Sequence, residues 1–288
     1  MCNSAATRHK ILGQRLNQSQ GFNPKQKTGI STSVLKCRDC GLIFSNPQPV
    51  PFDIQDHYGI PPEEYWQKEY FNVDENYFSH QIKTTKRISQ FNDGMKALDI
   101  GAGLGKCMIA MNKAGYDVYG FEPSVPFYNN AIEKLNIPPE KIKLGMFEEM
   151  NYENHFFDFI TFGAVLEHLY DPSEAIIKTL KWLKPGGLIH IEVPSSSYLI
   201  SKIFNFYFWV RGTNYVTNIS PMHMPFHLFE FELNSFKIHG KKHKYEIAHF
   251  EYYVCDMYFI PKTFHSLLKW YMKKTNKGMQ LAVWLRKI

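Results

Sequence analysis

The segment "LDIGAGLGK", Leu98–Lys106, decides the fold that we expect for this 288-residue chain. A short apolar run carries Asp99 and is followed by glycines at alternate positions, Gly101, Gly103 and Gly105. Glycine lets a backbone turn tightly and approach a ligand without an obstructing Cβ. The spacing is GxGxG, with Lys106 in sixth place. The pyrophosphate of a dinucleotide would require the third glycine one residue later, so this spacing disfavours a nicotinamide-dependent dehydrogenase.

Two carboxylates indicate which ligand the glycine segment binds. Glu122 ends the next strand-like run, "YGFEPS", at the distance along the chain expected for a hydrogen bond to a ribose diol. Asp99 precedes the first glycine by two residues, which is too close for a phosphate but suits a cationic amino group. Adenosine with a cationic amino-acid tail describes S-adenosylmethionine (SAM). The alternative for Asp99 is that it only caps the following helix.

The pattern around this segment predicts a parallel sheet. Strand-like runs alternate with helical runs of about a dozen residues, which is typical of βαβ units. The strands are expected at "KALDIGAG", "YDVYGFEPS", "KIKLGMF", "FFDFITFGAV" and "LIHIEVP", and the helices at "KCMIAMNKAG", "VPFYNNAIEKLN" and "PSEAIIKTLKWLKPGG". The last helix is expected to end in Pro-Gly-Gly.

From about Tyr65 to its end the chain resembles the class I SAM-dependent methyltransferases, in particular the small-molecule enzymes of the ubiquinone-biosynthesis type. Four segments in order carry the resemblance: "LDIGAGLGK", "GFEPS", "FDFITFGAVLEHLYDP" and "LKPGGLIHIEVP". The resemblance implies an α/β, Rossmann-like fold, with a seven-stranded, mostly parallel sheet and helices on both faces. Its last strand would be antiparallel, and "KGMQLAVWLRK" is placed to form it.

We predict two regions from these patterns. Residues 1–57 form a degenerate zinc-ribbon-like segment, and residues 58–288 form the methyltransferase domain. Within that domain we expect N-terminal helices over residues 58–92 and a lid or acceptor-binding insertion over residues 195–235.

The resemblance also implies residue roles. Asp99 and the glycine loop would contact the methionine part of SAM, and Glu122 would hold the ribose. Residues after the third strand would flank the adenine, and Gly163–His168 would line the boundary between SAM and acceptor. The expected cofactor-binding residues are Asp99, Gly101, Ala102, Gly103, Gly105, Glu122, Pro123, Phe147, Glu148, Gly163 and Val165.

Histidines are the candidate catalytic residues. His168 follows the fourth strand directly and is the first candidate for a general base or acceptor-positioning group; the alternative is that Glu167 and His168 only cap the next loop. His223 and His227 lie in the aromatic segment "SPMHMPFHLFEF", as acceptor contacts or as structural residues. Some relatives of the ubiquinone type bind a divalent metal through Glu-x-x-Glu-His. Ala164 occupies the first of those positions here, which disfavours a catalytic metal.

Aromatic side chains concentrate in two further places. Residues 198–216 would form a lid or an apolar acceptor wall, or alternatively an ordinary buried helix or a dimer face. Near the N-terminus of the domain, aromatic residues would cover the SAM pocket or fill the core; these are Tyr65, Trp66, Tyr70 and Phe71.

The N-terminal cysteines resemble half of a zinc ribbon. "CRDCGLIFSNPQPVP" matches the second half of the ribbon in such methyltransferases, whereas the first half retains Cys2 but has Ala5 at the partner position. The expected zinc ligands are Cys2, Cys37 and Cys40, with His9 as a possible fourth. The alternative is a ribbon that has lost its metal and persists as packing. A thioredoxin-like role is disfavoured because the CxxC leads into apolar "GLIF" and opens no helix.

Composition limits the remaining functions. The net charge of +6 is mild and its Lys and Arg are scattered, so we expect no nucleic-acid partner. Five cysteines form no secreted disulfide framework, and residues 198–210 are too few to cross a bilayer. We expect a cytoplasmic enzyme that methylates a small molecule, with a sugar or another precursor of the cell surface or secondary metabolism as the candidate class. The alternative is a SAM-binding protein with a degenerate, non-catalytic site. The sequence does not specify the oligomeric state.

Overall fold

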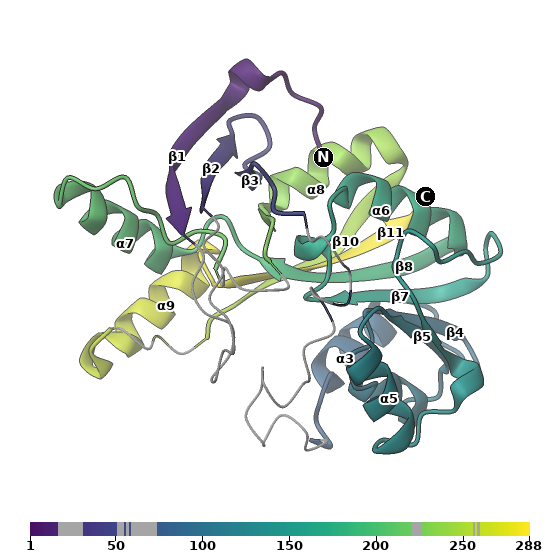
Figure 1. The fold of residues 1–288 in the computed structure, drawn as a ribbon. Helices are drawn as coiled ribbons and strands as arrows, with labels where there is room; N and C mark the ends of the chain where they lie inside the picture. The colour runs from purple at the N-terminus through teal and green to yellow at the C-terminus, as the bar shows by residue number, and fades with distance from the viewer. Residues whose placement is uncertain are drawn as a thin grey trace.

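Seven strands build the central sheet of the protein, in the order β10-β11-β8-β7-β4-β5-β6 (Figure 1). The structure, a computed structural model, describes residues 1–16, 31–50, 55, 58, 74–220, 226–255, 257 and 260–288. The strands are β4 (Lys96–Ile100), β5 (Asp117–Glu122), β6 (Ile142–Leu144), β7 (Phe157–Gly163), β8 (Leu183–Pro194), β10 (Tyr245–Tyr253) and β11 (Gln280–Lys287). β11 runs opposite to the other six strands of this sheet, which confirms the Rossmann-like expectation.

Helices cover both faces of the sheet because alternate strand residues point to opposite sides. Leu98 faces one apolar cluster with α6 and α8, whereas its neighbour Ala97 faces a second cluster with α3, α4 and α5. The helices are α3 (Ser79–Ile88), α4 (Lys106–Lys113), α5 (Val125–Glu133), α6 (Pro172–Trp182), α7 (Leu199–Val210), α8 (Leu233–His243) and α9 (His265–Thr275). Single 3₁₀ turns are η1 (Ala6–Arg8), η3 (Pro139–Lys141), η4 (Leu166–His168) and η5 (Lys262–Phe264). None of the described helices combines the length and apolarity needed to cross a membrane.

The helix α6 ends earlier than its sequence suggested. It stops at Trp182, and Leu183 is already extended and pairs with Phe157 of β7. Proline disfavours helical backbone in the residue before it, so Pro185 keeps Lys184 out of the helix. The Pro-Gly-Gly segment therefore belongs to β8, and the expectation that it ends the helix is wrong.

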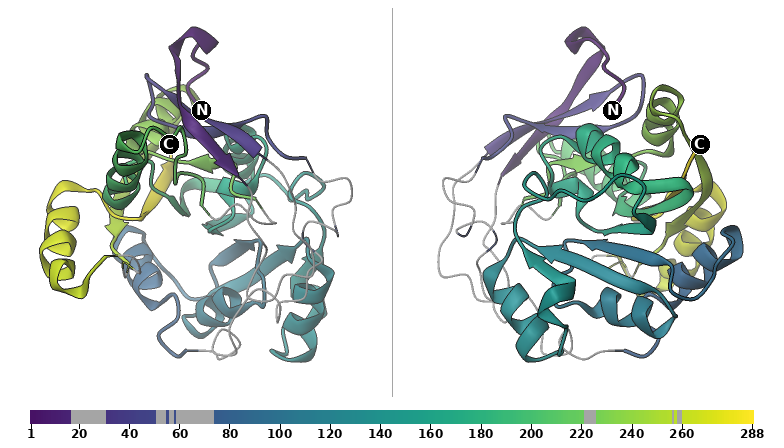
Figure 2. Two further views of the ribbon diagram at one scale, coloured as in Figure 1. Left: turned by 60° about the vertical axis from the view of Figure 1, so that its left-hand side comes forward. Right: turned by 90° about the vertical axis from the view of Figure 1, so that its right-hand side faces the viewer.

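A second sheet of four antiparallel strands carries the N-terminal segment, in the order β1-β2-β3-β9. Figure 2 shows these strands on the side of the large sheet where α8 lies, away from α3 and α5. The strands are β1 (His9–Leu16), β2 (Ser31–Cys37), β3 (Ile43–Asn46) and β9 (Phe229–Glu230). Because β9 follows α7 in the chain, the predicted N-terminal segment completes its sheet with a strand from the predicted insertion. The boundary at residue 57 stays a prediction.

Some expectations fall outside the described residues. These are the roles of Tyr65, Trp66, Tyr70, Phe71 and His223, and any helix between residues 59 and 73.

Candidate active site

The glycine loop leaves the carboxyl end of β4 in a conformation that favours glycine. Gly101, Gly103 and Gly105 all have positive φ angles, of 67°, 55° and 80°. A Cβ on Gly101 would stand 2.6 Å from the Val165 side chain, and one on Gly105 would stand 2.7 Å from Ile137. Both the backbone conformation and the close packing therefore require the GxGxG pattern.

Glu122, at the end of β5, fastens this loop. Its Oε2 accepts a hydrogen bond of 2.8 Å from the Gly103 amide, and its Oε1 accepts one of 2.9 Å from the Ser124 amide. The side chain is buried, and burial raises its pKa to about 7 although both amide hydrogen bonds act in the opposite direction. Carboxylate oxygens have further lone pairs, so ribose hydroxyls could share this acceptor.

Asp99, the last polar residue of β4, is buried with one oxygen unused. Its exposed fraction is 4%, and Oδ2 has no hydrogen-bond partner among the described residues. Burial, and then the charge of Glu122, raise its pKa to about 8, while a hydrogen bond from the Cys107 thiol lowers it. A buried carboxyl group with a free oxygen fits a cationic ligand, because a nearby positive charge would favour its ionised form. The residues present thus fit the amino group of SAM.

Two more carboxyl groups lie at the same edge of the sheet, one on the buried Glu167 and one on the half-buried Glu192. Burial raises the pKa of Glu167 to about 8, and it also raises the pKa of Glu192, at the end of β8. Glu192 pairs with Gly163 in the β7–β8 register, which places it beside the expected SAM–acceptor boundary. The sequence analysis assigned no role to Glu192 or Cys107. The sequence feature that could have pointed to Glu192 is its position as the single acid within the apolar run "LIHIEVP". No feature of the sequence singles out Cys107.

Phe147 and Glu148, the residues expected to flank adenine, lie in different surroundings. The Phe147 ring packs in the core, with ring centroids 6.1 Å from Phe162 and 5.8 Å from Trp182. Glu148 is exposed, and the Lys178 ammonium donates to its carbonyl at 2.8 Å. Phe147 and Glu148 line a hollow of about 530 Å³ along α6, which contains neither Asp99 nor Glu122 among its lining residues.

The turn after Glu122 makes a contact that the sequence did not suggest. The Gln55 amide donates to the Pro123 carbonyl at 3.0 Å, and its oxygen accepts from the Val125 amide at 3.4 Å. A residue from the N-terminal segment therefore holds the turn next to the candidate ribose site.

The boundary segment after β7 lies directly over the glycine loop. Gly163 is exposed, Ala164 has a positive φ of 56°, and the Val165 side chain packs on Gly101. Alanine in this conformation is strained, and such strain occurs preferentially at functional sites. Val165 thus packs against the glycine loop, and the contact of Gly163 and Val165 with SAM stays a prediction.

His168 and His227 lie together with Glu167, although they come from separate segments. Their possible ligand atoms all lie within 4.8 Å of one another, and the two imidazole rings are 4.7 Å apart at their centroids. His168 Nδ1 lies 2.9 Å from the Phe226 carbonyl. A carbonyl only accepts, so Nδ1 carries the proton and Nε2 of the neutral ring has the lone pair. This group could position an acceptor, take a proton or hold a divalent ion.

Comparison with known proteins identifies the family. A methyltransferase-domain family matches residues 73–234, more than half of the chain. The chain belongs to the SAM-dependent methyltransferase family. It is 26% identical over 125 residues to phosphoethanolamine N-methyltransferase 2 of Caenorhabditis elegans, covering 42% of this chain and 29% of that protein. It is 31% identical over 113 residues to demethylmenaquinone methyltransferase of Bacillus mycoides, covering 37% of this chain and 48% of that protein.

The matched segments thus span less than half the length of these two relatives. A SAM-dependent methyltransferase from Mesorhizobium loti has a similar fold, with a TM-score of 0.50, 12% identity and coverage of 75% of this chain and 100% of that chain. At this identity the likeness concerns the fold alone.

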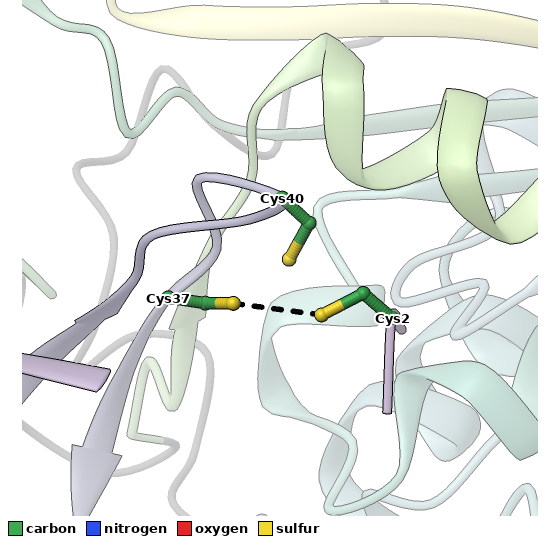
Figure 3. Close-up of side chains that lie close together, drawn as sticks. All are labelled: Cys2, Cys37 and Cys40. Carbon is green, nitrogen blue, oxygen red and sulfur yellow. Dashed lines mark hydrogen bonds between the residues drawn. The ribbon is translucent and has the colours of Figure 1, made fainter. Parts of the chain in front are cut away.

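The methyltransferase also contains a cluster of three thiols near its N-terminus. Figure 3 shows Cys2, Cys37 and Cys40 converging, and Cys2 Sγ lies 3.5 Å from Cys37 Sγ. Their ligand atoms lie within 4.8 Å of one another. Burial raises the pKa of Cys2, but hydrogen bonds with Ser4 and with the other two thiols bring it down to about 7. Three thiols suit zinc, one ligand short of a complete structural site.

His9 does not join the thiols. Its ring packs edge-on against Phe44 with centroids 5.0 Å apart, and it is absent from the group of possible ligands. In this conformation the fourth position would be left to water or another ligand.

We expect the thiol cluster to hold about one zinc ion per chain. Metal analysis of the purified protein measures the zinc content per chain, and Cys37→Ser should abolish zinc binding. Cys255→Ser is the matched control, because Cys255 is not a member of the cluster. A folded wild-type protein without metal would contradict the prediction.

We expect the stability of the ligand-free protein to fall as pH rises. The folded state raises the pKa of Asp99 from 3.8 to about 8, so its contribution is complete below 3.8 and is lost as pH rises toward 8. Asp99→Asn should reduce this loss, leaving the smaller contributions of Glu122 and Glu167. Unfolding free energies across this range measure it, and an unchanged slope in the variant would refute the assignment.

Proposed function

We propose that this protein transfers the methyl group of SAM to a small-molecule acceptor. The observation that carries the proposal is the buried, unused Oδ2 of Asp99 beside a left-handed glycine loop. The comparisons support it through the family, and Glu122 supports it by lying where a ribose would need an acceptor.

The charge of the site supports SAM over a dinucleotide. SAM carries a positive sulfonium as well as an ammonium group, whereas a pyrophosphate is negative. Asp99, Glu122 and Glu167 are all buried with raised pKa values, so a cationic ligand would relieve the cost of ionising them. A negatively charged pyrophosphate at the same edge would increase the cost of ionising these carboxyl groups.

The chain itself has to orient the reactants and exclude water. Bound SAM supplies an electrophilic methyl group on sulfur. Asp99 would hold the ammonium group, Glu122 the ribose, and Val165 would close the loop from the acceptor side. The exposed Gly163 leaves room for the acceptor next to this boundary.

His168 supplies the proton chemistry of this proposal. The acceptor atom attacks the methyl carbon in line as the carbon–sulfur bond breaks, and a protonated acceptor must lose a proton to a base. The Nε2 lone pair of His168 would take it, while the Phe226 carbonyl holds the ring. Glu167 and His227 lie close enough to stabilise the imidazolium.

Our proposal describes the acceptor only as a small molecule. The two relatives are named for phosphoethanolamine and demethylmenaquinone, which differ in chemistry and so favour no single acceptor. A sugar or another precursor of the cell surface or secondary metabolism remains our candidate class.

Calorimetric titration tests cofactor binding. SAM and S-adenosylhomocysteine should bind and NAD should not. Asp99→Asn should weaken the binding of SAM about 10- to 100-fold, because a charge-assisted hydrogen bond to a buried group is lost. Asp117→Asn is the matched control, since Asp117 lies at the opposite end of the sheet in β5. Binding of NAD alone would overturn the proposal.

Substitution of His168 separates catalysis from binding. His168→Ala should lower turnover about 100-fold and leave SAM affinity unchanged, because general-base catalysis acts on the acceptor proton. S-adenosylhomocysteine formed with pooled small-molecule acceptors, together with mass spectrometry for one added methyl group, measures turnover. His155→Ala is the control, on the exposed surface before β7. SAM binding without methyl gain by any acceptor would favour the non-catalytic alternative.

A further inference from the structure

Two helices outside the candidate site expose several large apolar side chains. On α7, the exposed fractions are 64% for Phe206, 70% for Trp209 and 63% for Val210. On α9, they are 63% for Leu267 and 57% for Trp270. Side chains of this size contribute more stability when buried, so their joint exposure on neighbouring helices requires an explanation.

The two helices form one platform. Ile200 of α7 and Met272 of α9 belong to the same small apolar cluster, which Phe204 and Leu268 join from the same helices. Figure 1 shows both helices protruding from one side of the molecule, with α9 below α7. The inner faces are therefore already used for packing, and the exposed aromatic residues lie on the remaining faces.

The two helices of the platform carry basic residues and no acidic ones. The sequence has no Asp or Glu between Glu192 and Glu230, nor after Asp256, whereas basic residues recur in both segments. On and beside the two helices these are Lys202, Arg211, Lys262, Lys269, Lys273, Lys274 and Lys277.

Several of these cations lie beside the exposed rings. The Lys274 ammonium is 5.1 Å from the centre of the Trp270 ring, and the Lys277 ammonium is 5.2 Å from that of Tyr271. The Arg211 guanidinium donates to the Tyr207 hydroxyl at 3.2 Å. Rings bordered by long basic side chains are typical of helices that lie in the interface of a bilayer, where the rings enter the acyl boundary and the cations contact phosphates.

We propose that α7 and α9 together dock this protein on an anionic membrane surface. At 12 residues α7 is roughly 18 Å long, too short to cross a bilayer but sufficient to lie along one. The occupant is a lipid surface and not a second copy of the chain, because pairing this face with itself would bring together the basic residues of two helices that carry no Asp or Glu of their own. Lysine is also depleted at the cores of protein interfaces.

The platform is connected to the candidate active site through β8. Helix α7 begins five residues after β8 ends, at the same carboxyl edge that carries Glu192. A membrane on this platform would therefore face the side from which an acceptor enters. The docking itself is independent of whether the site transfers methyl groups.

Vesicle co-sedimentation tests the proposal with the full chain. The protein should bind vesicles that contain phosphatidylglycerol, bind phosphatidylcholine alone much more weakly, and dissociate at high salt, because the attraction is screened. Trp209→Ala combined with Trp270→Ala should weaken binding about tenfold or more. Lys273→Glu combined with Lys274→Glu should weaken it about 25-fold or more, as each basic residue near an anionic surface contributes about fivefold.

The matched control is Lys113→Glu combined with Lys237→Glu, two exposed lysines on α4 and α8 that make the same change in net charge. This control should weaken binding much less than the platform variant. Thermal unfolding of each variant confirms that it is folded, since all these residues lie on the surface. Equal binding by the platform and control variants would overturn the proposal. So would failure to bind phosphatidylglycerol vesicles, or a dimer in solution that the Trp variant dissociates.

Discussion

The hydrogen bond from the Gly103 amide to the Glu122 carboxylate joins the two strands that build the candidate site. It requires that the loop after β4 turn back toward the end of β5, which positive φ angles at three glycines permit. The Ala102 amide reinforces the connection by donating to the Phe121 carbonyl at 2.9 Å. The loop is fixed in this way beside Asp99, a buried residue of β4 whose charge depends on what binds there.

Residues with strong local constraints were predictable from the sequence. The glycine spacing, the acid after β5 and the alternation of strands and helices each arise from local geometry, and they predicted a parallel sheet with helices between its strands. The antiparallel β11 was implied by the family resemblance. The end of α6 was not predicted correctly, because the helical period of "IIKTLKWL" continues up to a proline whose effect acts on the residue before it. The contacts of Gln55 and the burial of Glu192 depend on tertiary packing, so no local pattern carried them.

Side-chain orientation was the least predictable property of the site. Phe147 follows the third strand as the resemblance implied, yet its ring joins the core with Phe162 and Trp182 because a large aromatic side chain contributes more when it is buried there. His9 is likewise only seven residues from Cys2 in the sequence, but its ring packs on Phe44. His168 and His227 come together through tertiary contacts between their segments, in which the Leu228 amide donates to the Glu167 carbonyl at 2.8 Å and His168 Nδ1 contacts the Phe226 carbonyl.

The pairing of β3 with β9 has a consequence for how the chain folds. The turn that carries the CxxC is held by α8, where the Ser235 hydroxyl donates to the Cys40 carbonyl across 195 residues of sequence. Contacts of such long separation form late, because the intervening chain must first be ordered. During synthesis the N-terminal strands would therefore emerge long before their last partner, and this small sheet would be completed after most of the large one. Deleting the first fifty residues would correspondingly expose an edge of β9 and the start of α8, so the N-terminal segment acts as a late-closing part of the protein's own core.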